Sequence, residues 1–242
     1  MTKFAILASA STAIAATTSS FAGPLLTITG SVGGYAVISA SSTGSATATA
    51  NRFSYIGGLV SKYPGPDWAI SWDLVGDDTT APSNTNKTAF VTNGFRVQNL
   101  TGMAKTFDIT LTMAAPRPGD PYGLQCYAML GGTLTSDAAS STATLTSTGA
   151  LWTGMINGTA RAASALMPSA NVSTLLTTSF GPVTSSPKEN VTSALTDIGY
   201  RMQFTLGARS TAVFTGYWEV PTPGAFALMA VAGVVGRRRR TN

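Results

Sequence analysis

The sequence predicts an all-β protein, more specifically an antiparallel β-sandwich of the jelly-roll or immunoglobulin-like kind. Apolar and polar residues alternate in many short runs between Gly23 and Val220, which is the pattern of strands with one buried face. Clusters of Gly, Pro, Asn, Asp and Ser separate these runs, as turns do. No long stretch in this range repeats its apolar residues at the helical period of 3.6. Many short strands with regular turns are typical of a sandwich or barrel.

The clearest strand spans residues 106–113, where apolar residues from Phe107 to Met113 alternate with Thr and Asp. The runs 202–206 and 211–218 alternate in the same way, and the short turn between them predicts a hairpin. Ala162–Met167 is the one segment that favours a short helix. Other strands are expected at Leu25–Thr29, Tyr35–Ala40, Arg52–Val60, Asp67–Val75, Phe90–Asn99, Gln125–Leu134 and Ala143–Thr148, and near Leu151–Ile156, Val172–Phe180 and Thr192–Ile198.

One strand carries four large apolar side chains at alternate positions: Trp68, Ile70, Trp72 and Leu74. The shared parity places them on one face of a sheet. Such a face is either an aromatic platform for sugar rings or a stripe of the core, and the interleaved aliphatic residues favour the core. Trp152, Tyr217 and Trp218 are less constrained, and one of them is a candidate surface aromatic.

Three acidic residues lie at a strand end and in the loop after it: Asp73, Asp77 and Asp78. They are candidate oxygen ligands for calcium. Their spacing does not match an EF-hand loop, and Asp is also common before turns because its side chain bonds to the local backbone. Both interpretations stay open, and we expect no other metal and no cofactor.

The composition disfavours most enzyme classes. There is no His, so the commonest general base and metal ligand is absent. The single Cys, Cys126, has no His to activate it and is expected to be a buried thiol, with an intermolecular disulfide as the alternative. Two carboxylates would suffice for glycoside hydrolysis, but nearly all the acids are Asp in expected turns. We therefore expect no catalytic activity.

The net charge of +5 is concentrated at the two ends of the chain. Lys3 and four arginines near the C-terminus account for it, while Gly23 to Glu219 contains ten basic and ten acidic residues. Nucleic-acid binding needs clustered basic residues that neutralise phosphates, and this neutral body has none interleaved with aromatics. We expect no nucleic-acid partner.

The N-terminus, residues 1–22, has the layout of a secretory signal peptide. Lys3 precedes an Ala-rich apolar stretch, and Ser20-Phe21-Ala22 fits the small-x-small cleavage pattern. A buried first helix or a disordered terminus is the alternative. The body, residues 23–219, shows no repeat and no long linker, which predicts one domain.

The C-terminus, residues 220–242, has three successive parts. A Pro-x-Pro motif comes first, then an apolar run over 225–236, and then a basic end. The run is shorter than the roughly 20 residues of an ordinary spanning helix, so it is a marginal membrane anchor whose basic flank stays cytoplasmic. Proline stops a strand and leaves accessible backbone for a protease. The motif comprises Val220, Pro221, Thr222, Pro223 and Gly224, and the basic end comprises Arg237, Arg238, Arg239 and Arg240.

This three-part tail resembles the PEP-CTERM sorting signal of Gram-negative bacteria. The resemblance implies recognition by an exosortase, a membrane transpeptidase-like enzyme, and removal of the tail near Pro221–Pro223. Thr222 lies at the position that is Glu in the Pro-Glu-Pro motif after which the family is named. A plain tail-anchored helix is the alternative. The segments 68–74, 94–101 and 105–111 are also similar to β-rich ectodomains found before such tails, whose activity is mostly unassigned.

The sequence therefore predicts an exported protein of the cell surface or the extracellular matrix. The resemblance implies an exosortase as partner, transient anchoring in the inner membrane, and a place in an exopolysaccharide matrix, as in a biofilm. A carbohydrate-binding module that acts on exopolysaccharide is the alternative function.

Overall fold

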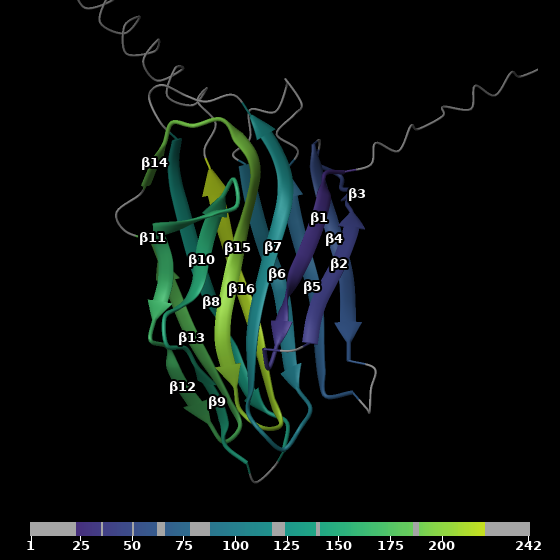
Figure 1. The fold of residues 1–242 in the computed structure, drawn as a ribbon, viewed down its shortest axis with the longest axis vertical. Helices are drawn as coiled ribbons and strands as arrows, with labels where there is room; N and C mark the ends of the chain where they lie inside the picture. Colours follow the sequence, from purple (N-terminus) through teal and green to yellow (C-terminus); the bar gives the residue numbers. More distant parts are fainter. Residues whose placement is uncertain are drawn as a thin grey trace, which may run out of the picture.

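The computed structural model describes residues 23–34, 36–49, 51–61, 66–77, 88–117, 124–138, 141–185 and 189–220. In these ranges the chain is all-β and forms two antiparallel sheets that pack face to face as a β-sandwich (Figure 1). No helix within the described residues is long and apolar enough to cross a membrane. The expected signal segment 1–22 and the tail after Val220 lie outside these ranges.

The first sheet has the strand order β11-β10-β15-β7-β1-β2, with β9 beside β15 and β12 beside β9. Its long centre is β15 against β7, which pair from Leu195↔Arg117 to Leu206↔Lys105. The bounds of its strands are β1 (Leu25–Val32), β2 (Ala36–Thr43), β7 (Lys105–Arg117), β9 (Ala143–Thr146), β10 (Ala150–Ile156), β11 (Thr159–Pro168), β12 (Asn171–Thr174) and β15 (Leu195–Leu206).

The second sheet has the order β13-β8-β16-β6-β5-β4-β3, with β14 also on β8. Its central strand β16 is flanked by β6 and β8 along nearly its whole length. The bounds of its strands are β3 (Ser45–Ala46), β4 (Arg52–Val60), β5 (Trp68–Asp77), β6 (Thr88–Asn99), β8 (Leu124–Ser136), β13 (Thr177–Thr184), β14 (Glu189–Val191) and β16 (Ser210–Val220).

The core lies between the sheets and follows the alternation of the sequence. On β7 the apolar residues from Phe107 to Met113 are fully buried, while the residues between them are not. The stripe Trp68, Ile70, Trp72 and Leu74 is buried as well, which confirms the core interpretation and removes it as a sugar platform. Cys126 is buried, as expected.

The expected hairpin over 202–218 is wrong. β15 belongs to the first sheet and β16 to the second, so the turn after Leu206 carries the chain from one sheet to the other. Consecutive strands often pair, but here each strand already has two longer-range neighbours. The expected segment Val172–Phe180 is likewise divided between sheets, as β12 and β13.

The expected short helix at Ala162–Met167 is also wrong, because this segment is part of β11. It pairs with β10, where Leu166 lies opposite Trp152 and Ala165 opposite Thr153. Alanine favours a helix, but a local preference of this size is overridden when pairing buries Leu166 in the core.

The first and the last described strands bring the two ends of the domain to the same end of the sandwich. β1 starts and β16 finishes at the upper end in Figure 1. The strand register agrees with this view. Leu26 of β1 pairs with Met113, and Leu195 of β15 pairs with Arg117, so β1 and β15 both start beside the end of β7. β16 follows β15 and runs back to that same end.

Candidate functional site

The residues of the expected sorting motif begin where β16 ends. Val220 is the last residue of this strand and lies opposite Thr88 of β6. Pro221, Thr222, Pro223 and Gly224 lie outside the described residues, as do the arginines at 237–240. The motif therefore follows a central strand of the second sheet directly, with no intervening linker in the sequence.

The structure describes two of the three candidate calcium ligands, Asp73 and Asp77, and their side chains lie in different surroundings. Asp77 is buried at the end of β5 and accepts a hydrogen bond from Arg52 Nε at 2.8 Å, so its carboxylate is already paired with a cation. Asp73 lies exposed on β5, and Asp78 is outside the described residues. Within the part of the chain that the structure describes, no group of three or more acidic or Cys side chains is placed to hold a metal ion.

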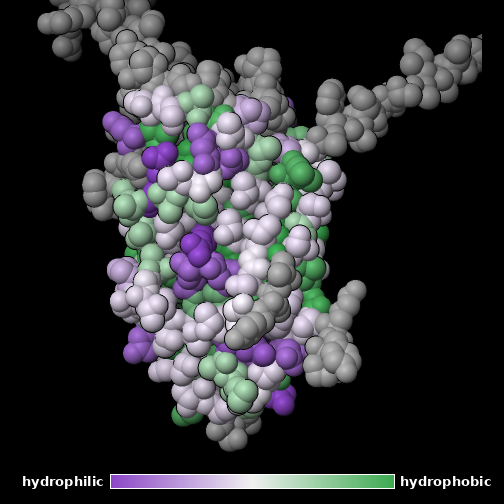
Figure 2. Space-filling view, viewed as in Figure 1, coloured by the Kyte–Doolittle hydropathy of each residue, from purple (hydrophilic) through white to green (hydrophobic). Residues whose placement is uncertain are grey.

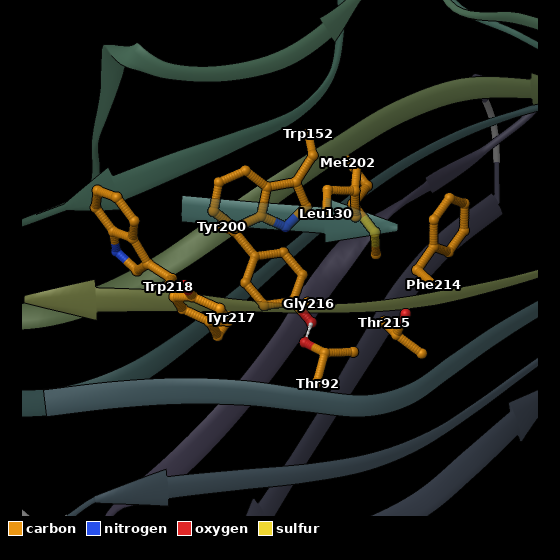
Figure 3. A pocket seen from close by; sticks show the side chains of 10 residues that line it. All are labelled: Thr92, Leu130, Trp152, Tyr200, Met202, Phe214, Thr215, Gly216, Tyr217 and Trp218. Carbon is orange, nitrogen blue, oxygen red and sulfur yellow. Dashed lines mark hydrogen bonds between the residues drawn. The ribbon is translucent and has the colours of Figure 1, made fainter. Parts of the chain in front are cut away.

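Of the three less constrained aromatic residues, Trp152 and Trp218 are buried, while Tyr217 is only partly buried and its ring lies 5.4 Å from that of Tyr127. Trp152, Tyr200 and Trp218 pack together between the sheets, with ring centroids 5.3 and 6.0 Å from Trp152 (Figure 3). The enclosed space beside them is about 10 Å³, at most the room of a single water molecule. Tyr200 is fully buried and shares a 2.9 Å hydrogen bond with Thr92. This cluster is a piece of core and holds no ligand-sized cavity.

A larger hollow lies on the outer face of the first sheet. It has a volume of about 420 Å³ and is lined mainly by polar residues of β7, β15 and the segment after β9. Figure 2 shows this face, with hydrophilic residues gathered near its middle. We call it the sheet-face groove; the residues that define its chemistry are Ser31, Thr106, Asp108, Thr148, Gln203 and Thr205.

The sheet-face groove is flanked by a bidentate ion pair. Arg201 Nε donates to Asp108 Oδ1 at 2.8 Å, and Arg201 Nη2 donates to Asp108 Oδ2. Gln203 Nε2 adds a donor to Oδ2 at 3.2 Å. The hydrogen bond from Arg201 is the main cause that lowers the pKa of Asp108, and the same bond raises the pKa of Arg201. The carboxylate of Asp108 is therefore ionised and held in one orientation, and its charge is balanced by that of Arg201.

Hydroxyl groups continue this polar surface. Thr106 and Thr205 lie opposite each other on β7 and β15 and share a 3.0 Å hydrogen bond between their Oγ1 atoms. Among the described residues that line the groove, Asp108 supplies a carboxylate. The arrangement presents hydroxyl, amide and carboxylate groups that can donate and accept hydrogen bonds.

The sheet-face groove was not foreseen from the sequence, although its residues were expected on the correct strand faces. Asp108 belongs to the polar face of the run 106–113, and Gln203 and Thr205 to that of the run 202–206. The pairing of β7 with β15 brings them together across 95 residues between Asp108 and Gln203. The alternation of polar and apolar residues indicated which side chains share a face of a strand. The sequence does not show which strands are neighbours in the sheet.

The fold and this groove define the class of the protein as a two-sheet antiparallel β-sandwich with a polar outer face. A comparison with protein-family models finds no match, and a comparison with curated proteins finds none either.

Proposed function

We propose that this chain is an exported, non-catalytic protein of the cell envelope or extracellular matrix, delivered by a C-terminal signal that an exosortase processes. The observation that carries the proposal is the order of parts after β16: a Pro-x-Pro motif, a short apolar run and four arginines. On this proposal the segments 1–22 and 225–236 form short helices that hold the chain in the inner membrane only during export.

The position of the two domain ends supports this proposal. Both β1 and β16 meet their neighbouring segments at the same end of the sandwich (Figure 1). A chain tethered after Val220 would stand on that end, with the turns at the opposite end directed away from the membrane.

Of the two expected sandwich types we favour the jelly roll, because the chain changes sheet between β6 and β7, between β7 and β8, and between β15 and β16.

The sorting proposal is tested by replacing both prolines of the motif, Pro221→Ala and Pro223→Ala, and measuring the mass of the mature protein. The wild type should lack its tail and the variant should retain it. The chain provides a matched control, since Pro64 and Pro66 have the same Pro-x-Pro spacing but no apolar run after them. Changing those two should leave processing intact. A tail-less Pro221/Pro223 variant would overturn the proposal.

Binding of a neutral exopolysaccharide is the second candidate function, and the sheet-face groove favours it. Sugar hydroxyls are recognised by oriented amide, carboxylate and hydroxyl groups, and the groove presents Gln203, Asp108 and several hydroxyls. All four tryptophans are buried, so quenching of their fluorescence would not report on this face. Calorimetric titration with neutral polysaccharides is the suitable test. Gln203→Ala should weaken binding, while Gln98→Ala on the other sheet should not.

A further inference from the structure

The two lateral sides of the sandwich differ in how their edge strands are protected. Edge strands expose unpaired backbone groups, and proteins usually block them with charges, prolines or bulges. β11 and β13, on one side, both show a register shift against their neighbours. β11 also carries Arg161 and ends at Pro168, and β13 contains Pro182. β11 and β13 are therefore each protected against strand addition.

On the opposite side, the described strands β2 and β4 carry none of these devices apart from Arg52. β2 pairs with β1 over Leu25↔Thr43 to Val32↔Ala36 without a shift, and its sequence AVISASST contains neither charge nor proline. β4 pairs with β5 without a shift as well. The short β3 covers only Phe53 and Ser54 of β4, and the segment Ile56–Val60 beyond it is also free of charge and proline. We call this side the open β2–β4 side.

Exposed apolar side chains lie on the open β2–β4 side. Ile56 is 75% exposed and Val60 is 53% exposed, both on the outward face of β4. Hydrophobic surface is visible along this side in Figure 2. Among the described side chains of β2, Ser39, Ser41 and Thr43 are exposed and carry small hydroxyl groups. The one charged residue of β4, Arg52, is already paired with Asp77.

We propose that a second copy of this chain docks along the open β2–β4 side, with β2 antiparallel to the β2 of its partner and the two β4 strands side by side. An antiparallel pair of identical edges is self-complementary. No like charges would face each other along β2 or along Ile56–Val60, and Ile56 and Val60 would be covered by the partner. Because β11 and β13 are protected, neither of these strands can continue the assembly beyond a dimer in the same way.

The test uses cysteine cross-linking of the purified protein under oxidising conditions, so its outcome does not depend on export. The native Cys126 is only 2% exposed, so the wild type should give no disulfide-linked species. Ser39→Cys and Ser41→Cys place a thiol on β2, and Ala165→Cys is a matched control at an exposed position of β11. Disulfide-linked dimers are expected for at least one β2 variant and not for the control. Absence of dimers from both β2 variants, or equal cross-linking of Ala165→Cys, would overturn the proposal.

A second measurement separates pairing from chance collision. Ile56→Lys introduces a charge that would face its counterpart in the dimer, and the side chain is exposed, so the fold should be unaffected. Combined with the β2 variant that cross-links, it should reduce the dimer several-fold, with an unchanged melting temperature. Undiminished cross-linking would contradict the docking of β4, and a monomeric mass for the wild type by sedimentation would contradict the dimer itself.

Discussion

Asn99 of β6 donates a hydrogen bond from Nδ2 to the carbonyl oxygen of Gly207 at 2.8 Å, across 108 residues of sequence. Its side chain is fully buried, and Nδ2 also bonds to the carbonyls of Met103 and Leu206, at 2.7 and 3.1 Å. Its Oδ1 accepts from the backbone and the hydroxyl of Thr101. This one side chain therefore links the β6–β7 turn to the β15–β16 turn. In each of these turns the chain passes from one sheet to the other.

Asn99→Ala should therefore be strongly destabilising, by about 3 kcal/mol, because it leaves several buried carbonyl groups without a donor. The free energy of unfolding from urea titration is the measurement. Gln98→Ala is the control: Gln98 is only partly buried and makes one 3.2 Å bond, to Thr211. It should cost less than about 1 kcal/mol. Equal losses for the two variants would show that the Asn99 network contributes little.

Tyr200 and Thr92 should show strong energetic coupling. Tyr200→Phe leaves Thr92 Oγ1 buried without its 2.9 Å partner, which should cost about 1 to 2 kcal/mol. Thr92→Val should lower the free energy of unfolding by a similar amount, because it removes the same hydrogen bond from the buried hydroxyl of Tyr200. The double variant removes both polar groups and should recover part of the loss. Losses that simply add in a double-mutant cycle of urea unfolding would contradict the coupling.

The stability of the domain should be nearly constant at neutral pH and should fall at both extremes. There is no His to titrate in between. Burial raises the pKa of Tyr200, and burial together with the hydrogen bond to Tyr127 raises the pKa of Tyr217 to about 12. Their folded-state pKa values exceed the unfolded value, so this stability is present below about pH 10 and is lost as the pH rises further.

On the acid side the sign is reversed. The folded-state pKa of Asp108 is lowered, so its contribution is present above about pH 4 and is lost as the pH falls through the lowered value. The loss should be small, about 0.5 kcal/mol, because the pair with Arg201 is partly solvent-exposed. Melting temperatures across pH give the profile. Tyr200→Phe should reduce the alkaline fall and Asp108→Asn the acid one; a maximum that shifts within the neutral range would contradict both assignments.

Gly57 of β4 should be intolerant of a side chain. A Cβ at this position would lie 2.4 Å from Cζ2 of Trp72, which is buried on the neighbouring strand β5. Gly57→Ala should cost about 2 kcal/mol, because a packed indole must move. Gly94→Ala on β6 is the matched control, since a Cβ there would have nothing within 4 Å. Thermal melting distinguishes the two, and a neutral Gly57→Ala would show that Trp72 can shift freely.

The sequence by itself determined most of the strands, their inward faces and the distribution of charge, although it favoured a helix at Ala162–Met167, where β11 lies. Alternation along a strand is a local property, so the buried face of residues 106–113, the stripe from Trp68 to Leu74 and the buried Cys126 were all foreseeable. The neutral body and the three-part tail are likewise properties of the linear chain.

Only the tertiary structure decided which strands pair. A strand with one apolar face accepts any neighbour that continues its sheet, so nothing local distinguishes a hairpin between β15 and β16 from a crossing between sheets. The pairing of β15 with β7 then brings Asp108, Arg201 and Gln203 into one groove, and the strand order leaves β2 and β4 at the open side. These features depend on contacts between residues far apart in the sequence. Such contacts are fixed by the strand arrangement that buries the whole core at once.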